Sequence, residues 1–330
     1  MPVSDILPTV LPGEKTYIIF DFNGGGIKGV IPARICTELE AYLKKPLYQI
    51  ADLISGTSTG AILGGMLGAG VPAQTCLDLY KVQGPQLFKP RPWWYPVNWF
   101  REKYDRAPFI KAIGDALEQH SVVKKRNMKL NEMLTKFMCT STSIVDGLTH
   151  YFKGWEDKDG QVEAGDIENS AISRSYAAAY YFGAIVDDAA QQVWADGGEG
   201  AQNCTLKACA NEAINQGWAK TSKVYIISMG CGQAPIGKPY SEAKKMGWVG
   251  QVEYYLGIAR NQSTIDQIYS VNNLKKLGVQ IEFDRLDIDI PASMDELDAV
   301  KYINDFDNMA IQKLTNDIAK VVKKIQIYKP

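Results

Sequence analysis

Strands that end abruptly in glycine-rich turns dominate the first part of the chain. The β-branched and aromatic run from Tyr17 to Phe22 predicts a strand, and Asn23-Gly24-Gly25-Gly26 ends it. A helix-spaced apolar pattern follows, and the order then repeats with a strand in Ile50 to Ser55, the turn Gly56 to Gly60 and a small-residue helix. Because such crossover helices join parallel strands, the sequence predicts an α/β protein, a three-layer α/β/α fold with a mainly parallel central sheet.

The rest of the chain fits this class. Strand-like runs occur at 136–144, 193–195 and 224–228, and helical patterns at 107–118 and 171–181. The region 294–330 carries apolar residues at helical spacing among charges, which predicts closing helices. No internal repeat or linker stands out, so we expect residues 1–330 to form a single domain.

Composition excludes several classes of function. The 330 residues include 36 basic and 37 acidic side chains, mixed along the chain, so no single-sign field favours a nucleic-acid partner. The 6 cysteines lack paired metal-ligand spacing, and 2 histidines are too few for a His-rich metal centre. We therefore expect reduced thiols, no metal site and no cofactor.

The chain start predicts no export signal, because it lacks a basic segment followed by an apolar one. Residues 53–77 are uncharged, but six glycines and the Ser-Gly-Thr-Ser-Thr-Gly cluster favour a buried turn and helix over a membrane span. We expect a soluble cytoplasmic protein, either peripheral at membranes or delivered as an effector, whose oligomeric state, a homodimer included, is left open.

The turn Gly56-Thr57-Ser58-Thr59-Gly60 matches Gly-x-Ser-x-Gly after a strand and before a helix. Its glycines allow a cramped turn that lifts the serine hydroxyl out of the backbone, and the helix behind it favours developing negative charge. Ser58 is therefore the candidate nucleophile, against the alternative of a purely structural turn.

A serine nucleophile needs a base, and the chain restricts the choice. No histidine follows His150, which lies in an alternating, strand-like run where a packed or exposed histidine is the simpler interpretation. Asp196 ends a short strand and precedes Gly197 and Gly198, which permit close approach. Asp196 is the candidate base, against the alternative that it caps a turn.

The loop Gly24-Gly25-Gly26-Ile27-Lys28-Gly29 lies between a strand and a helix, so its backbone amides form a candidate oxyanion site. The same residues match a dinucleotide fingerprint, Gly24-x-Gly26-x-x-Gly29, with Asp52 as the nearest candidate for a ribose-binding acid. A nucleotide-binding oxidoreductase therefore stays open as an alternative, as does a catalytically silent binding protein on the same fold.

Taken together, these blocks resemble the patatin-like phospholipase family. The glycine loop is similar to its oxyanion-hole motif, the turn at Ser58 to its nucleophile motif, and Asp196-Gly197-Gly198 to its acid motif. Residues 171–182, 227–232 and the region after Met294 resemble further blocks of the family. The chain departs from the family at Asn23, where aspartate is usual, and at Lys28, where arginine is usual.

The resemblance implies a lipid acyl hydrolase of the phospholipase A or lysophospholipase type with a Ser58 and Asp196 dyad. Its substrate would be a phospholipid or another lipid ester, and it would release free fatty acid. The segment 88–104 combines three prolines with seven aromatic side chains. It is either a cap over the site or a transient membrane contact. The candidate lipid contacts are Trp93, Trp94, Trp99 and Phe100.

Overall fold

The computed structural model describes residues 15–91, 102–155, 168–178, 180–200, 202–235 and 237–329. Its strands are β1 Thr16–Phe22, β2 Leu53–Gly56, β3 Lys136–Ser143, β4 Thr149–Lys153, β5 Ile185–Asp187, β6 Gln192–Asp196, β7 Lys223–Met229 and β8 Ile281–Leu286. Its α-helices are α1 Val30–Leu43, α2 Leu47–Ile50, α3 Thr59–Gly68, α4 Ala73–Asp78, α5 Gly84–Leu87, α6 Ala107–His120, α7 Glu168–Ser175, α8 Leu206–Asn215, α9 Trp218–Thr221, α10 Tyr240–Ala243, α11 Trp248–Lys276 and α12 Ile303–Tyr328. Short 3-10 or π turns occupy Gly26–Gly29, Leu79–Gln83, Leu130–Glu132, Ala292–Met294 and Val300–Tyr302.

The strands form one mixed sheet in the order β5-β6-β3-β2-β1-β7-β8, with β4 also paired to β3. Strands β3, β2, β1, β7 and β8 are parallel, whereas β4 and β6 run antiparallel to β3. The predicted fold class is confirmed. The antiparallel edge follows from short connections, because β4 and β6 are not preceded by crossover helices that would return the chain to the same end.

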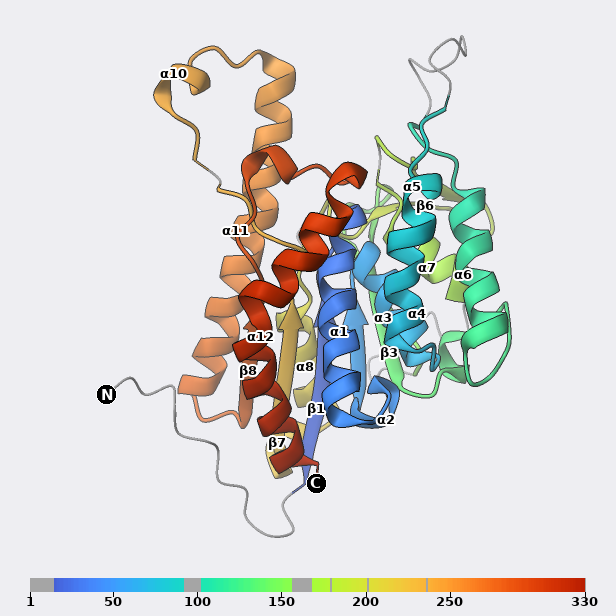
Figure 1. Cartoon of the computed structure of the whole chain (residues 1–330), viewed down its shortest axis with the longest axis vertical. Helices are drawn as coiled ribbons and strands as arrows, with labels where there is room; N and C mark the ends of the chain where they lie inside the picture. Colours follow the sequence, from blue (N-terminus) through green and yellow to red (C-terminus); the bar gives the residue numbers. More distant parts are fainter. Residues whose placement is uncertain are drawn as a thin grey trace.

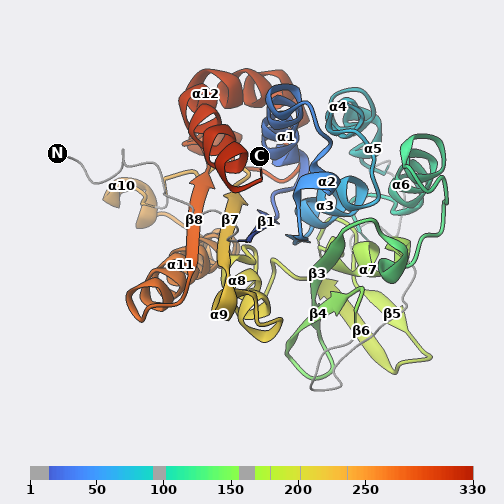
Figure 2. The same ribbon diagram turned by 90° about the horizontal axis from the view of Figure 1, so that it is seen from below.

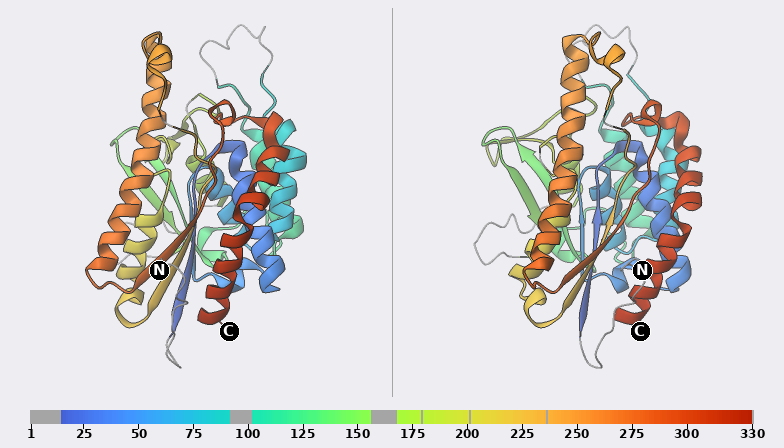
Figure 3. Two further views of the ribbon diagram at one scale, coloured as in Figure 1. Left: turned by 60° about the vertical axis from the view of Figure 1, so that its left-hand side comes forward. Right: turned by 90° about the vertical axis from the view of Figure 1, so that its left-hand side faces the viewer.

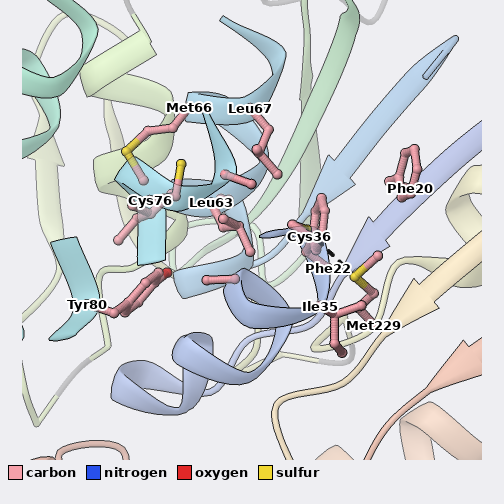
Figure 4. Close-up of a cluster of buried hydrophobic side chains, with 14 of the residues drawn as sticks. Phe20, Phe22, Ile35, Cys36, Leu63, Met66, Leu67, Cys76, Tyr80 and Met229 are labelled. Carbon is pink, nitrogen blue, oxygen red and sulfur yellow. Dashed lines mark hydrogen bonds between the residues drawn. The ribbon is translucent and has the colours of Figure 1, made fainter. Parts of the chain in front are cut away.

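Helices cover both faces of the sheet, as Figure 2 shows along the strands. Helices α1, α3, α4 and α12 lie on one face, and α8, α9 and α11 on the other (Figures 1 and 2). Strand β1 alternates accordingly: Phe20 and Phe22 enter the larger core cluster, whereas Ile19 enters the smaller one. Figure 4 shows Phe22 beside Cys36 and Met229 in the larger cluster, with Phe20 drawn apart from them.

Helix α12 is fastened to the first face by a buried carboxylate. Asp307 forms a bidentate ion pair with Arg34 of α1 and a second ion pair with Lys81 of the π turn at Leu79–Gln83. These neighbours lower the pKa of Asp307, although its burial acts in the opposite direction. The chain just before α12 lies against the glycine loop after β1, where the Leu297 carbonyl accepts a hydrogen bond from the Ile27 N–H.

One predicted helix is shorter in the structure, and one long helix has no counterpart among the predictions. The helix predicted over 171–181 ends at Ser175, because the carbonyl groups of Ser175 and Ala177 accept hydrogen bonds from Gly197 and Asp196 and cannot continue a helix. The long helix α11 was not predicted at all. Figure 3 shows it running along the second face and extending past the ends of the strands. No helix in the described ranges is long and apolar enough to cross a membrane.

Candidate active site

Ser58 occupies a strained turn between β2 and α3. Its φ of 56° and ψ of −122° lie outside the regions that L residues ordinarily adopt, and it is the N-cap residue of α3. The turn requires glycine on both sides, since a Cβ on Gly56 would lie 2.3 Å from the Gly60 oxygen and one on Gly60 would lie 2.2 Å from the Phe22 oxygen. The half-buried Ser58 side chain is thus held at the positive end of the helix dipole.

Neighbouring side chains hold the turn in place. The buried Thr57 hydroxyl lies 2.6 Å from the Thr140 hydroxyl and donates to the Gln202 carbonyl at 2.6 Å. On the other side of the turn, the Thr59 hydroxyl lies 2.6 Å from the hydroxyl of Tyr80. The backbone N–H of Ser58 donates to Ser175 Oγ at 2.9 Å.

Asp196 ends β6 directly opposite Ser141 of β3 and is 4% exposed. Its Oδ1 accepts a hydrogen bond from the Gly198 N–H at 2.7 Å. The next position, 197, requires glycine, because a Cβ there would lie 2.2 Å from Thr140 Oγ1. Thr140 therefore contacts both the turn that carries Ser58 and the turn that carries Asp196, and it keeps the two turns adjacent.

The pKa of Asp196 is raised to about 7. The main cause is burial, which disfavours the carboxylate, and the Glu199 carboxylate raises the pKa further. A hydrogen bond from the Ser58 side chain, the Gly198 N–H and the charge of Arg260 act in the opposite direction. The side chains of Ser58 and Asp196 are therefore close enough to influence each other, and both residues line the same cavity.

Some backbone N–H groups of the predicted glycine loop donate hydrogen bonds to carbonyls elsewhere in the chain, and others do not. Gly24 donates to the Asn203 carbonyl at 3.1 Å, and Ile27 donates to the Leu297 carbonyl at 2.8 Å. Within the described part of the chain, the N–H groups of Gly25 and Gly26 donate to no carbonyl outside their own loop. These two residues also line cavities together with Ser58.

The remaining loop residues have structural contacts. The buried Lys28 forms an ion pair with Asp295 and so ties the loop to the segment before α12. A Cβ on Gly29 would lie 2.5 Å from Thr59 Oγ1, so this glycine allows the loop to pack against the turn of Ser58. Gly26 has a φ of +60°, and a Cβ there would lie 2.1 Å from the Leu297 oxygen.

Ser58 lines two cavities of different chemistry. One is almost entirely apolar; it is lined by Gly26, Ile27, Ser58, Thr59, Ile62, Leu79, Tyr80, Gly84, Leu87, Phe88, Phe109, Ala112, Ile113, Tyr176 and Phe182. The other, called the polar cavity below, has a mixed lining with three charged side chains; it is lined by Gly25, Ser58, Ala178, Asp196, Gly198, Glu199, Asn203, Arg260 and Leu297. The serine hydroxyl thus lies where an apolar space meets a polar one.

Several sequence candidates lie elsewhere. His150 pairs with Asp146, with 2.8 Å between Nε2 and Oδ2, and packs edge-on against Trp194; it does not line either cavity at Ser58. Asp52 precedes β2, at the end opposite to the glycine loop, where it accepts from the Ile18 N–H and pairs with Lys329. The predicted ribose-binding role of Asp52 is therefore wrong.

The candidate lipid contacts Trp93, Trp94, Trp99 and Phe100 lie outside the described residues. The described ends of that segment do reach the site, since Phe88 lines the apolar cavity and packs edge-on against Tyr104 and Phe109. Ser175, Asn203 and Arg260 are not among the site residues that the sequence predicts. Only the spacing of Arg260, Thr264, Gln267 and Val271, which places them on one helix face, could have indicated the last of these.

An α/β sheet whose strand ends hold a serine on a strained turn, a buried carboxylate and a glycine loop defines a serine-hydrolase type of site. The chain belongs to the patatin-like phospholipase family, whose model matches residues 22–198. That range contains the glycine loop, Ser58 and Asp196.

Three relatives illustrate how far the similarity reaches. A cGAMP-activated phospholipase of Pseudomonas aeruginosa is 32% identical over 110 residues, which is 33% of each chain. Patatin-like protein 2 of Arabidopsis thaliana is 28% identical over 277 residues, 75% of this chain and 67% of the relative. Calcium-independent phospholipase A2-gamma of Oryctolagus cuniculus is 29% identical over 134 residues, 40% of this chain and 17% of the relative. The match thus spans a third or less of the length of two of these proteins.

Proposed function

We propose that the protein is a lipid acyl hydrolase that cleaves carboxylic ester bonds of phospholipids or related lipids and releases free fatty acid. The observation that carries the proposal is the position of Ser58 between an apolar cavity and a polar one, with Asp196 in the lining of the polar cavity. An ester that joins an acyl chain to a polar alcohol matches this arrangement, with the acyl chain in the apolar cavity and the alcohol in the polar one.

In the proposed mechanism Asp196 accepts the proton of the Ser58 hydroxyl while Oγ attacks the ester carbonyl carbon. The N–H groups of Gly25 and Gly26 stabilise the resulting oxyanion, together with the N-terminus of α3. The tetrahedral intermediate collapses to an acyl-serine, and the protonated Asp196 returns its proton to the leaving alcohol. Water attacks the acyl-serine with Asp196 as base, and the fatty acid leaves as Ser58 regains its proton.

The apolar cavity would hold the acyl chain. Ile62 of α3, Leu87 of α5 and Ala112 of α6 supply walls without charge, and the lining leads to Ser58. Burying methylene groups here contributes about 0.8 kcal/mol for each group removed from water, which favours long acyl chains over short ones.

The nucleotide-binding alternative has little support from the loop geometry. Two amides that would face a pyrophosphate, those of Gly24 and Ile27, already donate to Asn203 and Leu297. The carbonyl of Leu297 also lies close against Gly26.

The test is release of fatty acid from mixed phospholipid micelles, followed by mass spectrometry. We expect Ser58→Ala to lower turnover by about 10⁴-fold or more, since removing a nucleophile leaves only binding and oxyanion effects. Ser270→Ala, a change of a half-buried serine on α11 outside both cavity linings, is the matched control and should keep the parental rate. Parental turnover in Ser58→Ala would exclude the proposal.

A further inference from the structure

The polar cavity beside Ser58 contains a cation to which the proposed hydrolysis assigns no contact with the substrate. Of the described residues that line this cavity, only Arg260 is positively charged, whereas Asp196 and Glu199 are acidic. Arg260 is half-buried. Its charge acts on Asp196 and Tyr181, but within the described part of the chain its guanidinium forms no hydrogen bond or ion pair. A guanidinium without a partner in the protein is well suited to bind a carboxylate or a phosphate of a ligand.

The position of Arg260 is fixed by the rest of its helix. Arg260, Thr264, Gln267 and Val271 lie on one face of α11, at spacings of four, three and four residues. Val271 is fully buried in the smaller core cluster, and Thr264 is buried. This face therefore packs against the body of the protein, and Arg260 continues it toward the cavity.

Gln267 anchors the same face to the loop that follows Asp196. Its Oε1 accepts from the Lys207 N–H at 3.0 Å, and its Nε2 donates to the Cys204 carbonyl at 2.5 Å and to Gln202 Oε1 at 3.2 Å. Arg260 lies seven residues, or about 10 Å of helix, before this anchor. Figure 3 shows α11 continuing past the strand ends, so a helix rather than a loop positions the guanidinium.

We propose that Arg260 binds the phosphate of a glycerophospholipid while Ser58 attacks an acyl ester of the same molecule; this rests on the proposed function. A phospholipid carries its phosphate and its acyl esters on one glycerol unit, so a phosphate at Arg260 and an ester at Ser58 would face the same cavity, which both residues line. The Asn203 side chain lines the same cavity and offers further amide donors.

The acidic residues of the cavity sharpen this assignment. Asp196 and Glu199 repel a phosphate, so an anionic group is stable here only in contact with the guanidinium. A neutral diacylglycerol gains nothing from Arg260. The guanidinium therefore makes the site selective for phospholipids over neutral lipid esters.

The experiment compares kcat/KM for a short-chain phosphatidylglycerol and for a diacylglycerol with the same acyl chains, both as monomers in solution. We expect Arg260→Gln to lower the ratio of the two values by about 10- to 100-fold, the loss that follows when a charged hydrogen-bonding partner is removed. Arg260→Lys, which keeps the charge but not the fork of donors, should restore part of the ratio. Lys275→Gln removes a positive charge from an exposed position near the end of the same helix and should leave both values unchanged.

Each outcome has a distinct meaning. If the parental protein hydrolyses neither substrate, the proposed function fails and the role of Arg260 fails with it. If it hydrolyses both and Arg260→Gln lowers both equally or neither, only the role of Arg260 is wrong. If inorganic phosphate changes diacylglycerol turnover through Arg260 while the parental ratio shows no preference for phospholipid, the residue binds free phosphate and the assignment is overturned.

Discussion

At the scale of single residues, the site depends on a few groups that glycines bring close together. The sequence was sufficient to indicate Ser58 and Asp196 as candidates, because each lies beside glycines at the end of a strand. It could not indicate Ser175, which accepts from the Ser58 N–H, since that contact joins positions 117 residues apart. The dinucleotide interpretation was wrong about Asp52 for a related reason: the pattern does not say at which end of a strand an acid lies.

The first prediction concerns the protonation of Asp196. Because its pKa is raised to about 7, the general base is mostly protonated at pH 5, and hydrolysis should rise with pH and level off above about 7. Initial rates on a soluble ester between pH 5 and 9 measure this. A rate that is flat across pH 7 while ester chemistry limits turnover would contradict the assignment of Asp196 as base.

The free energy of unfolding should change with pH in the opposite direction to the rate of hydrolysis. A carboxyl group whose pKa is higher in the folded state than in the unfolded state stabilises the fold below its unfolded pKa, and this contribution is lost as the pH rises through about 7. The parental protein should therefore lose up to roughly 4 kcal/mol of unfolding free energy between pH 4 and 8 that Asp196→Asn does not lose. Urea unfolding measures the difference, with the exposed carboxylate change Asp317→Asn as the control. Parallel pH profiles for parental protein and Asp196→Asn would show that the carboxyl is not shifted.

At the scale of elements, strands with β-branched and aromatic runs were predictable, and helices without a clear stripe were not. The predicted strand at 17–22 is confirmed as β1, and the helix at 107–118 as α6. Helix α11 was missed because its apolar and polar residues are not sorted onto opposite faces. Helix α7 is shorter than predicted because the carbonyls of Ser175 and Ala177 accept hydrogen bonds from the end of β6 and the turn after it. Such contacts between distant segments cannot be predicted from local sequence.

Helix α6 gives a prediction about substrate choice. Ala112 is buried and faces the apolar cavity, so Ala112→Phe should occupy part of the space that an acyl chain would use. We expect kcat/KM to fall by about 10-fold or more for long-chain esters and to change by less than 3-fold for a butyrate ester. Ala116→Phe, at a buried α6 position outside the cavity lining, controls for general disruption of the helix. An equal loss for all chain lengths in Ala112→Phe would remove the acyl chain from this cavity.

At the scale of the whole molecule, the site is an assembly of distant segments. The glycine loop, the turn of Ser58, the turn of Asp196, the segment before α12 and helix α11 all meet at the carboxyl ends of the parallel strands (Figures 1 and 3). The order of glycine turns in the sequence predicted the parallel sheet and hence the meeting of the first two. It did not predict that Leu297 or Arg260 would complete the site, because those contacts depend on how α12 and α11 pack against the finished sheet.

The most direct test of the central claim is labelling with a fluorophosphonate probe, which forms a covalent bond only with an activated serine. We predict that the parental protein gains one probe mass at neutral pH, on the peptide that contains Ser58, and that Ser58→Ala gains none. Asp196→Asn should react at least about 100-fold more slowly, since the general base is lost. An unlabelled parental protein, or labelling that persists in Ser58→Ala, would contradict the account.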